Sequence, residues 1–166
     1  MRGFFGLIVV AFVVALASAG VAGASTTVAW QATFPEQFGG PNHSPFNCAP
    51  GTSCGSGEVT GLGQAQDVIE FGACSTDDVF CSVRTLTFAD GSTIVMDELF
   101  SNPQTPGNSG SAPGQAVGYG NPNTLDLTDT IVGGTGRFAG ASGTASGQVK
   151  VAGGTAIIHL SGTVTF

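Results

Sequence analysis

The C-terminal part of the chain alternates apolar and polar residues around one glycine-rich turn. From Thr124 the alternation runs into residues 133–138, which read GGTGRF, and two further alternating stretches reach Phe166. Alternation with a period of two is typical of half-buried β-strands, and glycine tolerates the positive φ of tight reversals. Glycine also recurs on the apolar face of both later stretches, where it relieves crowding in a coiled strand. The pattern predicts an all-β fold, a closed antiparallel β-barrel.

Alternation also recurs in the earlier part of the chain, bounded by Gly, Pro, Asn and Asp. It predicts strands over residues 28–34 and 58–71, with a proline- and cysteine-rich loop over residues 35–56 between them. Residues 101–123 break the pattern. Because a structureless loop of this length is uncommon, it is either a flap over the barrel mouth or contains a short strand at 116–119. In total we expect about eight strands.

One hairpin is predicted in detail, because Asp90 and Gly91 form a dipeptide that favours a two-residue type I′ turn. The turn joins strands over residues 82–88 and 92–100. Counting outward from it gives three cross-strand pairs on one face: Phe88 with Thr93, Leu86 with Val95, and Arg84 with Asp97.

The first 24 residues have the features of an export signal. Arg2 precedes an uncharged apolar run, and two Ala-x-Ala sites follow, the second ending at Ala24. An uncleaved membrane anchor is the alternative, although Gly20 and Gly23 weaken the second half of the run. We expect a signal peptide over 1–24 and a single domain over 25–166, in a secreted or periplasmic protein.

The expected mature chain is acidic. It keeps three basic residues, Arg84, Arg137 and Lys150, against 11 acidic ones, a net charge of −8. Such a surface repels phosphate backbones and anionic headgroups, so neither nucleic acid nor, after signal cleavage, a membrane is an expected partner.

Four cysteines in an exported chain indicate disulfides. Of three possible connectivities we prefer the local pairs, Cys48 with Cys54 and Cys74 with Cys81, because each closes a short polar loop. The rival interpretation is a zinc site. Its C-x2-C spacing is missing and no histidine falls at ligand spacing, so no metal and no cofactor is predicted.

Residues 130–143, TIVGGTGRFAGASG, resemble the strand-turn-strand signature of dirigent proteins and, more loosely, that of allene oxide cyclases. The resemblance covers the segment from Thr124 onward. It implies an eight-stranded barrel with an apolar cavity, often trimeric and without a cofactor. Dirigent proteins steer the coupling of radicals, and allene oxide cyclases close a fatty epoxide into a ring. No pocket residue of either family can be placed on this chain.

Four charged residues interrupt apolar faces and form our predicted ligand-binding set: Asp67, Arg84, Asp97 and Asp129. The Arg84–Asp97 pair would offer a polar handle for a ligand carboxylate or carbonyl, and its alternative is a salt bridge at the barrel rim. The two other carboxyl groups either lie in a pocket or at strand ends. His159 is expected to be exterior and solvated.

The sequence contains no recognisable catalytic constellation. The interpretation that we favour is a barrel that binds a small apolar or amphipathic ligand and that could steer its coupling or cyclisation. Two alternatives remain open. One is a non-catalytic envelope or extracellular protein whose barrel is filled by its own side chains, and the other is a small outer-membrane barrel.

Overall fold

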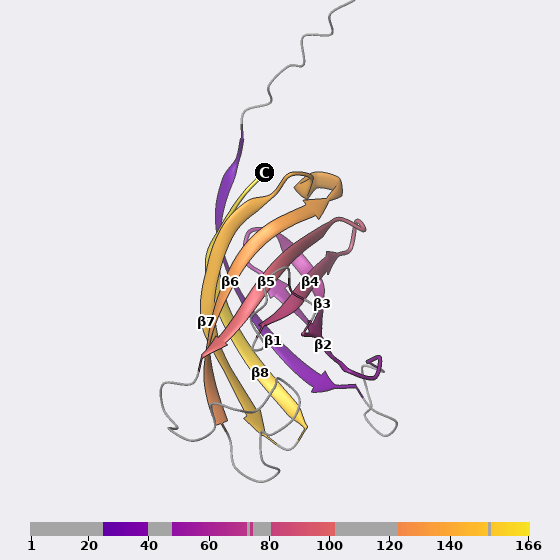
Figure 1. Cartoon of the computed structure of the whole chain (residues 1–166). Helices are drawn as coiled ribbons and strands as arrows, with labels where there is room; N and C mark the ends of the chain where they lie inside the picture. Colours follow the sequence, from indigo (N-terminus) through magenta and orange to yellow (C-terminus); the bar gives the residue numbers. More distant parts are fainter. Residues whose placement is uncertain (1–24, 40–47, 73, 75–80, 102–122, 153) are drawn as a thin grey trace, which may run out of the picture.

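A computed structural model describes residues 25–39, 48–72, 74, 81–101, 123–152 and 154–166. They form a closed antiparallel barrel in which each strand pairs with the next and the last pairs with the first (Figure 1). The strands are β1 (Thr27–Phe38), β2 (Thr52–Val59), β3 (Gly63–Phe71), β4 (Cys81–Phe88), β5 (Thr93–Ser101), β6 (Asn123–Thr135), β7 (Ser142–Ala152) and β8 (Thr155–Thr165), with a 3-10 helix, η1 (Gly136–Phe138), between β6 and β7.

The predicted eight-stranded antiparallel barrel is therefore confirmed. The predicted signal peptide, residues 1–24, lies outside the described residues, as do residues 102–122 of the predicted loop. Because neighbouring strands run in opposite directions, β1, β3 and β5 end where β2, β4 and β6 begin. We call this the Phe38 end of the barrel, and the opposite one the η1 end.

The N-terminal strands differ from the prediction in two places. β2 occupies part of the predicted loop 35–56, and the predicted strand 58–71 is interrupted by a turn between Val59 and Gly63. In that turn the Leu62 N–H donates to the Val59 carbonyl over 2.9 Å, and Gly61 has a φ of 80°. Val59 and Gly63 pair with each other, and three residues lie between them. Because both have odd numbers, the odd-numbered residues face inward before and after the turn. The sequence therefore shows one continuous alternation and gives no sign of the turn.

The β4–β5 hairpin has a different turn from the predicted type I′ turn. Phe88 donates its N–H to the Ser92 carbonyl and accepts a bond from the Gly91 N–H, both 2.9 Å long. The loop thus contains three residues, with Gly91 at a φ of 80°, as three-residue hairpin loops require at that position.

The extra loop residue shifts the register by one, so the three predicted cross-strand pairs are wrong. Arg84 pairs with Met96, and Asp97 pairs with Val83. A shift of one residue turns a strand's side chains to the opposite face. Glu98 consequently points into the barrel with Arg84, whereas Asp97 lies on the outward face.

The GGTGRF turn closes the η1 end. Phe138 is fully buried, and its ring lies 4.8 Å from that of Phe88 and 4.9 Å from that of Phe166. The Arg137 guanidinium lies over the Phe88 and Phe138 rings and donates to the Leu62 carbonyl over 2.6 Å. The glycine-rich turn thus returns an aromatic side chain to the core.

Inward-facing glycines allow the strands to pack closely at the β7–β8 pairing. A Cβ atom at Gly147 would lie 1.8 Å from the His159 carbonyl oxygen, and one at Gly162 would lie 2.2 Å from the Thr144 carbonyl oxygen. Only glycine fits such approaches. The rest of the interior is largely apolar and includes Trp30, Phe34, Leu86, Met96 and Leu160.

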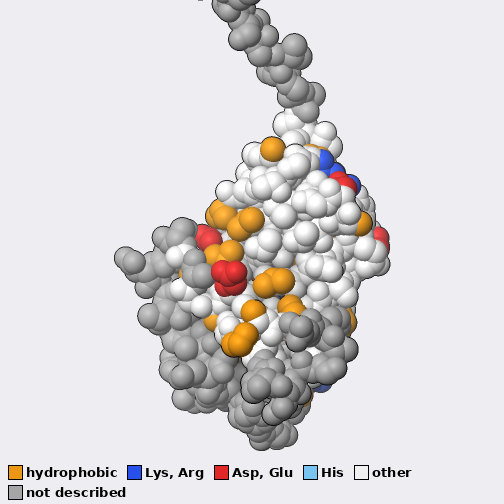
Figure 2. Space-filling model, turned by 90° about the vertical axis from the view of Figure 1, so that its right-hand side faces the viewer, with side chains coloured by type: hydrophobic (Ala, Val, Ile, Leu, Met, Phe, Trp, Pro, Cys, Tyr) orange, Lys and Arg blue, Asp and Glu red, His pale blue; other side chains and the backbone are white. Residues whose placement is uncertain are grey.

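The outward face is mainly Thr, Ser and Gln on β1, β7 and β8. On another side of the barrel, Figure 2 shows hydrophobic side chains gathered around acidic ones. The large hydrophobic residues exposed most are Leu99, Val132 and Ile157, which belong to three different strands. Single exposed apolar residues of this kind are normal on a protein surface.

We predict that Gly147→Ala lowers the free energy of unfolding by about 1–3 kcal/mol, because its methyl group would overlap the neighbouring strand's carbonyl oxygen. Gly133→Ala is the matched control, since a Cβ there meets nothing within 4 Å. Urea unfolding of both variants checks this. Equal losses would show that close strand contact is not the cause.

Candidate functional site

Five ionisable side chains converge inside the barrel, each from a different strand and each at most 2% exposed. They are Glu36 on β1, Asp67 on β3, Arg84 on β4, Glu98 on β5 and Asp129 on β6. We call them the carboxyl–arginine cluster. Their positions follow from the strand alternation, because each one continues the inward face of its strand.

Arg84 is the centre of the cluster. Its Nη1 donates to Glu36 Oε1 over 3.0 Å and also to Asp67 Oδ2. Its Nε donates to Glu98 Oε2 over 2.8 Å, and Nη2 lies 2.7 Å from the same oxygen. One guanidinium thus ties three other strands to β4 through charge-assisted hydrogen bonds.

Two serines complete the coordination of the glutamates. Ser53 donates to Glu36 Oε2 over 2.6 Å, and Ser82 donates to Glu98 Oε1 over 3.4 Å. Both oxygens of each glutamate therefore have a partner.

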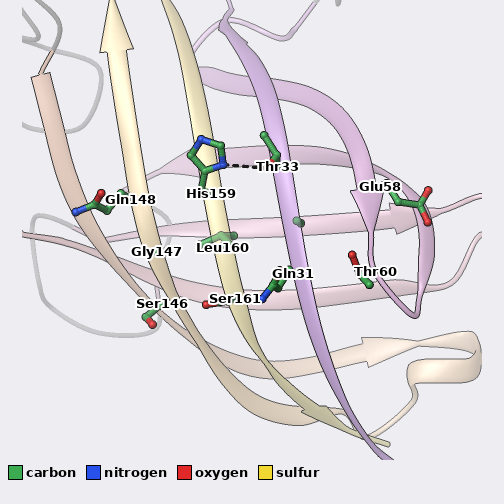
Figure 3. Close-up of a pocket in the computed structure, with 11 residues that line it drawn as sticks. Gln31, Thr33, Glu58, Thr60, Ser146, Gly147, Gln148, His159, Leu160 and Ser161 are labelled. Carbon is green, nitrogen blue, oxygen red and sulfur yellow. Dashed lines mark hydrogen bonds between the residues drawn. The ribbon is translucent and has the colours of Figure 1, made fainter.

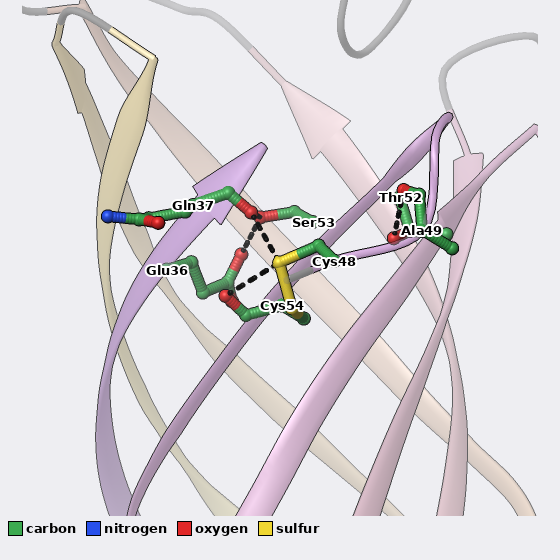
Figure 4. Close-up of a disulfide and its surroundings, with 7 residues drawn as sticks. All are labelled: Glu36, Gln37, Cys48, Ala49, Thr52, Ser53 and Cys54. Carbon is green, nitrogen blue, oxygen red and sulfur yellow. Dashed lines mark hydrogen bonds between the residues drawn. A yellow bond between two sulfur atoms is a disulfide. The ribbon is translucent and has the colours of Figure 1, made fainter. Parts of the chain in front are cut away.

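Both disulfides adjoin these serines, and the predicted pairing is confirmed. Cys48 is bonded to Cys54, the neighbour of Ser53, and Cys74 to Cys81, the neighbour of Ser82. Figure 4 shows the first bridge beside the Ser53–Glu36 hydrogen bond. By closing short loops, such bridges stabilise the fold by about 2–3 kcal/mol each in the chain-entropy picture. Here they also secure the strand starts that carry the serines.

The cluster keeps its guanidinium charged. Burial alone would lower the pKa of Arg84, but Asp67, then Glu98, Glu36 and Asp129, raise it well above its ordinary value. Burial raises the pKa of Asp67 well above its usual range, and Arg84 only partly opposes that increase. The remaining oxygen of Asp67, Oδ1, has no hydrogen-bond partner within the described residues.

Asp129 is the least satisfied member. It lies opposite Glu98 in the β5–β6 pairing, and neither of its carboxyl oxygens has a hydrogen-bond partner of ordinary geometry in the described ranges. Burial, followed by repulsion from Glu98, raises the pKa of Asp129 well above its usual range. Arg84 opposes this increase in the pKa, and a hydrogen bond between the protonated Asp129 and Glu98 adds to it. Buried polar groups normally have partners, so Asp129 marks a place where a further molecule could bind.

Four half-buried apolar side chains surround the cluster at the Phe38 end. They are Phe38, Phe71, Phe100 and Leu125, which we call the apolar rim. Phe38 and Phe100 follow Glu36 and Glu98 by two residues on the same strand faces. The rings of Phe38 and Phe71 lie 6.0 Å apart. The interior thus presents polar groups next to an apolar border, as sites for small amphipathic molecules do.

The structure brings together three of the four predicted ligand-binding residues. Asp67, Arg84 and Asp129 lie in one buried cluster, while Asp97 faces outward on β5, opposite Val83. The predicted Arg84–Asp97 pair is therefore wrong, because the register error placed Asp97 on the same hairpin face as Arg84. Whether the other three residues bind a ligand stays a prediction.

Sequence reasoning missed Glu36 and Glu98. The same register error placed Glu98 on the hairpin face opposite to that of Arg84. Glu36 lay in a predicted loop, although the alternation of Trp30, Ala32 and Phe34 continues to it across Pro35. Extending that alternation by two residues would have identified it.

A second concave region lies on the outside of the barrel. It is a groove of about 580 Å³ across β1, β7, β8 and the end of β2, lined by Gln31, Thr33, Glu58, Gln148 and His159 among others (Figure 3). His159 is exposed, as predicted, and its Nδ1 lies 2.9 Å from Thr33 Oγ1. The groove is open to water, and the carboxyl group among its lining residues, that of Glu58, is exposed.

Among the described residues, no three His, Cys, Asp or Glu side chains are grouped so that they could hold a metal ion. Nor does any helix in those residues have the length and hydropathy to cross a membrane. No family model, curated protein or solved structure matches the chain.

We predict that Arg84→Met lowers the free energy of unfolding at neutral pH by about 3–5 kcal/mol, because it leaves buried carboxyl groups without their cation. Lys150→Met is the control, since Lys150 is exposed on β7 and should change stability by less than about 0.5 kcal/mol. Chemical denaturation compares them. A loss below 1 kcal/mol for Arg84→Met would contradict the role of Arg84 as the centre of the cluster.

The raised pKa values of Asp67 and Asp129 predict how stability depends on pH. In the unfolded chain these two carboxyl groups lose their protons above about pH 4, whereas in the folded protein they keep them to higher pH. The free energy of unfolding should therefore fall as the pH rises from about 4 toward the folded pKa. Each group contributes at most about 1.4 kcal/mol per pH unit. Asp129→Asn should flatten the dependence of stability on pH above about pH 4. Asp126→Asn, on the outward face of the same strand, should leave the slope of the pH profile unchanged. Parallel profiles for the wild type and both variants would refute the protonation of Asp129 in the folded protein.

Proposed function

We propose that this barrel binds a small amphipathic molecule in its interior, with the polar end of the ligand at the carboxyl–arginine cluster and its apolar part against the apolar rim. The observation that carries the proposal is the buried Asp129 carboxyl group, which faces the Glu98 carboxyl group and accepts no hydrogen bond from a donor of the described residues. Leaving such a group unpaired is costly, whereas a ligand that pairs with it recovers that cost.

We further propose that the protein acts after export. Two disulfides are typical of a protein in a non-reducing compartment outside the cytosol. The apolar run in residues 1–24 and the acidic composition are consistent with a secreted or periplasmic location. The resemblance of residues 130–143 to dirigent proteins and allene oxide cyclases adds that a reactive ligand could be steered in its coupling or cyclisation inside the barrel.

A non-catalytic structural protein with a filled barrel is the second candidate, and one observation favours it. Toward the η1 end the interior is occupied by the chain's own side chains, including Trp30, Phe88 and Phe138. Small barrels can be packed in this way without a ligand. The two candidates differ at the Phe38 end, where only the first requires a bound molecule.

The distribution of polarity supports both candidates over a small outer-membrane barrel. Membrane barrels face the lipid with apolar side chains and hold polar ones inside. Here the described outward positions of β7 carry Ser142, Thr144, Ser146 and Gln148, whereas its inward positions carry Ala145 and Val149.

Trp30 allows a direct test, because it is the only tryptophan of the chain and lies inside the barrel, 2% exposed. Addition of octyl-chain amphiphiles below their micellar concentration should change its fluorescence and saturate at one molecule per barrel. Phe71→Ser should weaken the binding of every such probe by about 5–30-fold, the equivalent of 1–2 kcal/mol of lost apolar contact.

Leu99→Ser is the matched control, because Leu99 is apolar but faces outward and is 39% exposed. The Leu99→Ser variant should bind the octyl probes with the same affinity as the wild type. If no octyl probe binds to the wild-type protein by fluorescence or calorimetry, the filled structural barrel becomes the better interpretation.

A further inference from the structure

The atoms that remain unpaired in the cluster restrict the chemistry of the ligand's polar end. The carboxyl oxygens of Glu36 and Glu98 all contact Arg84 or a serine. The Arg84 guanidinium is itself surrounded by Glu36, Asp67 and Glu98. Four buried atoms of the cluster have no hydrogen-bond partner among the described residues: Asp67 Oδ1, both carboxyl oxygens of Asp129, and Arg84 Nη2. Nη2 nevertheless lies 2.7 Å from Glu98 Oε2, so the three carboxyl oxygens are the atoms left for a ligand.

The charges facing this site are unbalanced. β1, β3, β5 and β6 contribute one carboxyl group each, and β4 contributes the single cation, Arg84. The described inward positions of β2, β7 and β8 carry no titratable side chain, so nothing there offsets the excess. A ligand carboxylate would meet four carboxyl groups and a guanidinium that is already in use. The earlier expectation that Arg84 receives a ligand carboxylate is thus disfavoured.

We propose that the barrel binds an amphipathic amine, whose ammonium head lies at Asp129 and Asp67 and whose apolar chain lies against the apolar rim. This inference rests on the proposed function of the barrel as a ligand-binding protein. A primary ammonium has three N–H donors and no acceptor, which suits the three unpaired carboxyl oxygens of Asp67 and Asp129. Its positive charge also compensates the excess of buried carboxyl groups.

The apolar rim offers a surface of matching chemistry for the apolar chain of the ligand. Phe38 and Phe100 stand one inward position beyond the cluster on their strands, and Phe71 stands two beyond Asp67. A chain extending from the ammonium toward the Phe38 end would therefore pass among them. The aromatic faces of these residues also attract cations, which favours an ammonium over a neutral head as the ligand enters.

Binding of an ammonium has a consequence for protons. Burial raises the pKa of both Asp129 and Asp67, so the empty site holds protons that a bound cation would displace. The ammonium favours the ionised carboxyl, and affinity should therefore rise with pH up to the folded pKa of these groups. A neutral head of the same length has no such dependence.

The experiment compares octylammonium, octan-1-ol and octanoate, which share a tail and differ in the head. Isothermal titration calorimetry at several pH values, in buffers of different ionisation enthalpy, gives both affinity and protons released. We expect octylammonium to bind at least about tenfold more tightly than either of the other probes, the equivalent of one charge-assisted hydrogen bond. It should release up to about one proton per site and bind more tightly at pH 8 than at pH 5.

Asp129→Asn keeps the shape of the side chain and removes its charge, so it should reduce octylammonium binding about tenfold and abolish most of the proton release. Octan-1-ol should be little affected. Asp126→Asn, on the same strand but outward-facing, should bind octylammonium as the wild type does. If Asp129→Asn does not fold by circular dichroism, Asp67→Asn provides the same comparison.

The outcomes separate the two proposals. Equal binding of octylammonium and octan-1-ol, or tightest binding of octanoate, overturns the ammonium assignment but leaves ligand binding intact. Failure of all three probes overturns both proposals. Tight octylammonium binding that Asp129→Asn does not alter places the amine elsewhere, and it overturns the assignment to this cluster.

Discussion

The guanidinium of Arg84 lies in the interior of a closed barrel, where it contacts carboxyl groups from β1, β3 and β5. A charge without these partners could not be buried there at a tolerable cost. The same carboxyl groups need Arg84 and the serines beside the two disulfides. The charged centre, the strand register and the covalent bridges at the Phe38 end therefore depend on one another, and a change in any one of them would leave buried charge unpaired.

The rest of the barrel is built around that polar centre in two different ways. Toward the η1 end, the Phe88, Phe138 and Phe166 rings and the Arg137 side chain close the interior with packed aromatic contacts. Toward the Phe38 end, half-buried phenylalanines border carboxyl oxygens that have no partner in the described residues. One end is thus closed by packed side chains, and the other is where we propose that a ligand binds. Separating the two tasks along the axis allows a small barrel to keep a filled core and still offer a polar site.

Individual residues show how far the sequence predicts the site and where prediction fails. Asp67 and Asp129 were identified because each interrupts an apolar face, which alternation alone reveals. Glu98 and Asp97 were interchanged, because the Asp90–Gly91 dipeptide fits both a two-residue and a three-residue loop, and one residue reverses every side chain beyond it. Glu36 was missed because Pro35 suggested a loop, although β1 continues through it.

The sequence by itself determined the all-β class, the glycine-rich reversal and the two faces of each of the last two strands, and it favoured the local disulfides. Each of these depends on residues close together in the chain, whose spacing and conformational preferences can be read directly. Only the tertiary structure decided which carboxyl groups surround Arg84, and which of their oxygens stay unpaired. Those contacts join residues up to 48 positions apart, and they follow from closure of the barrel and from a register that local propensities leave ambiguous.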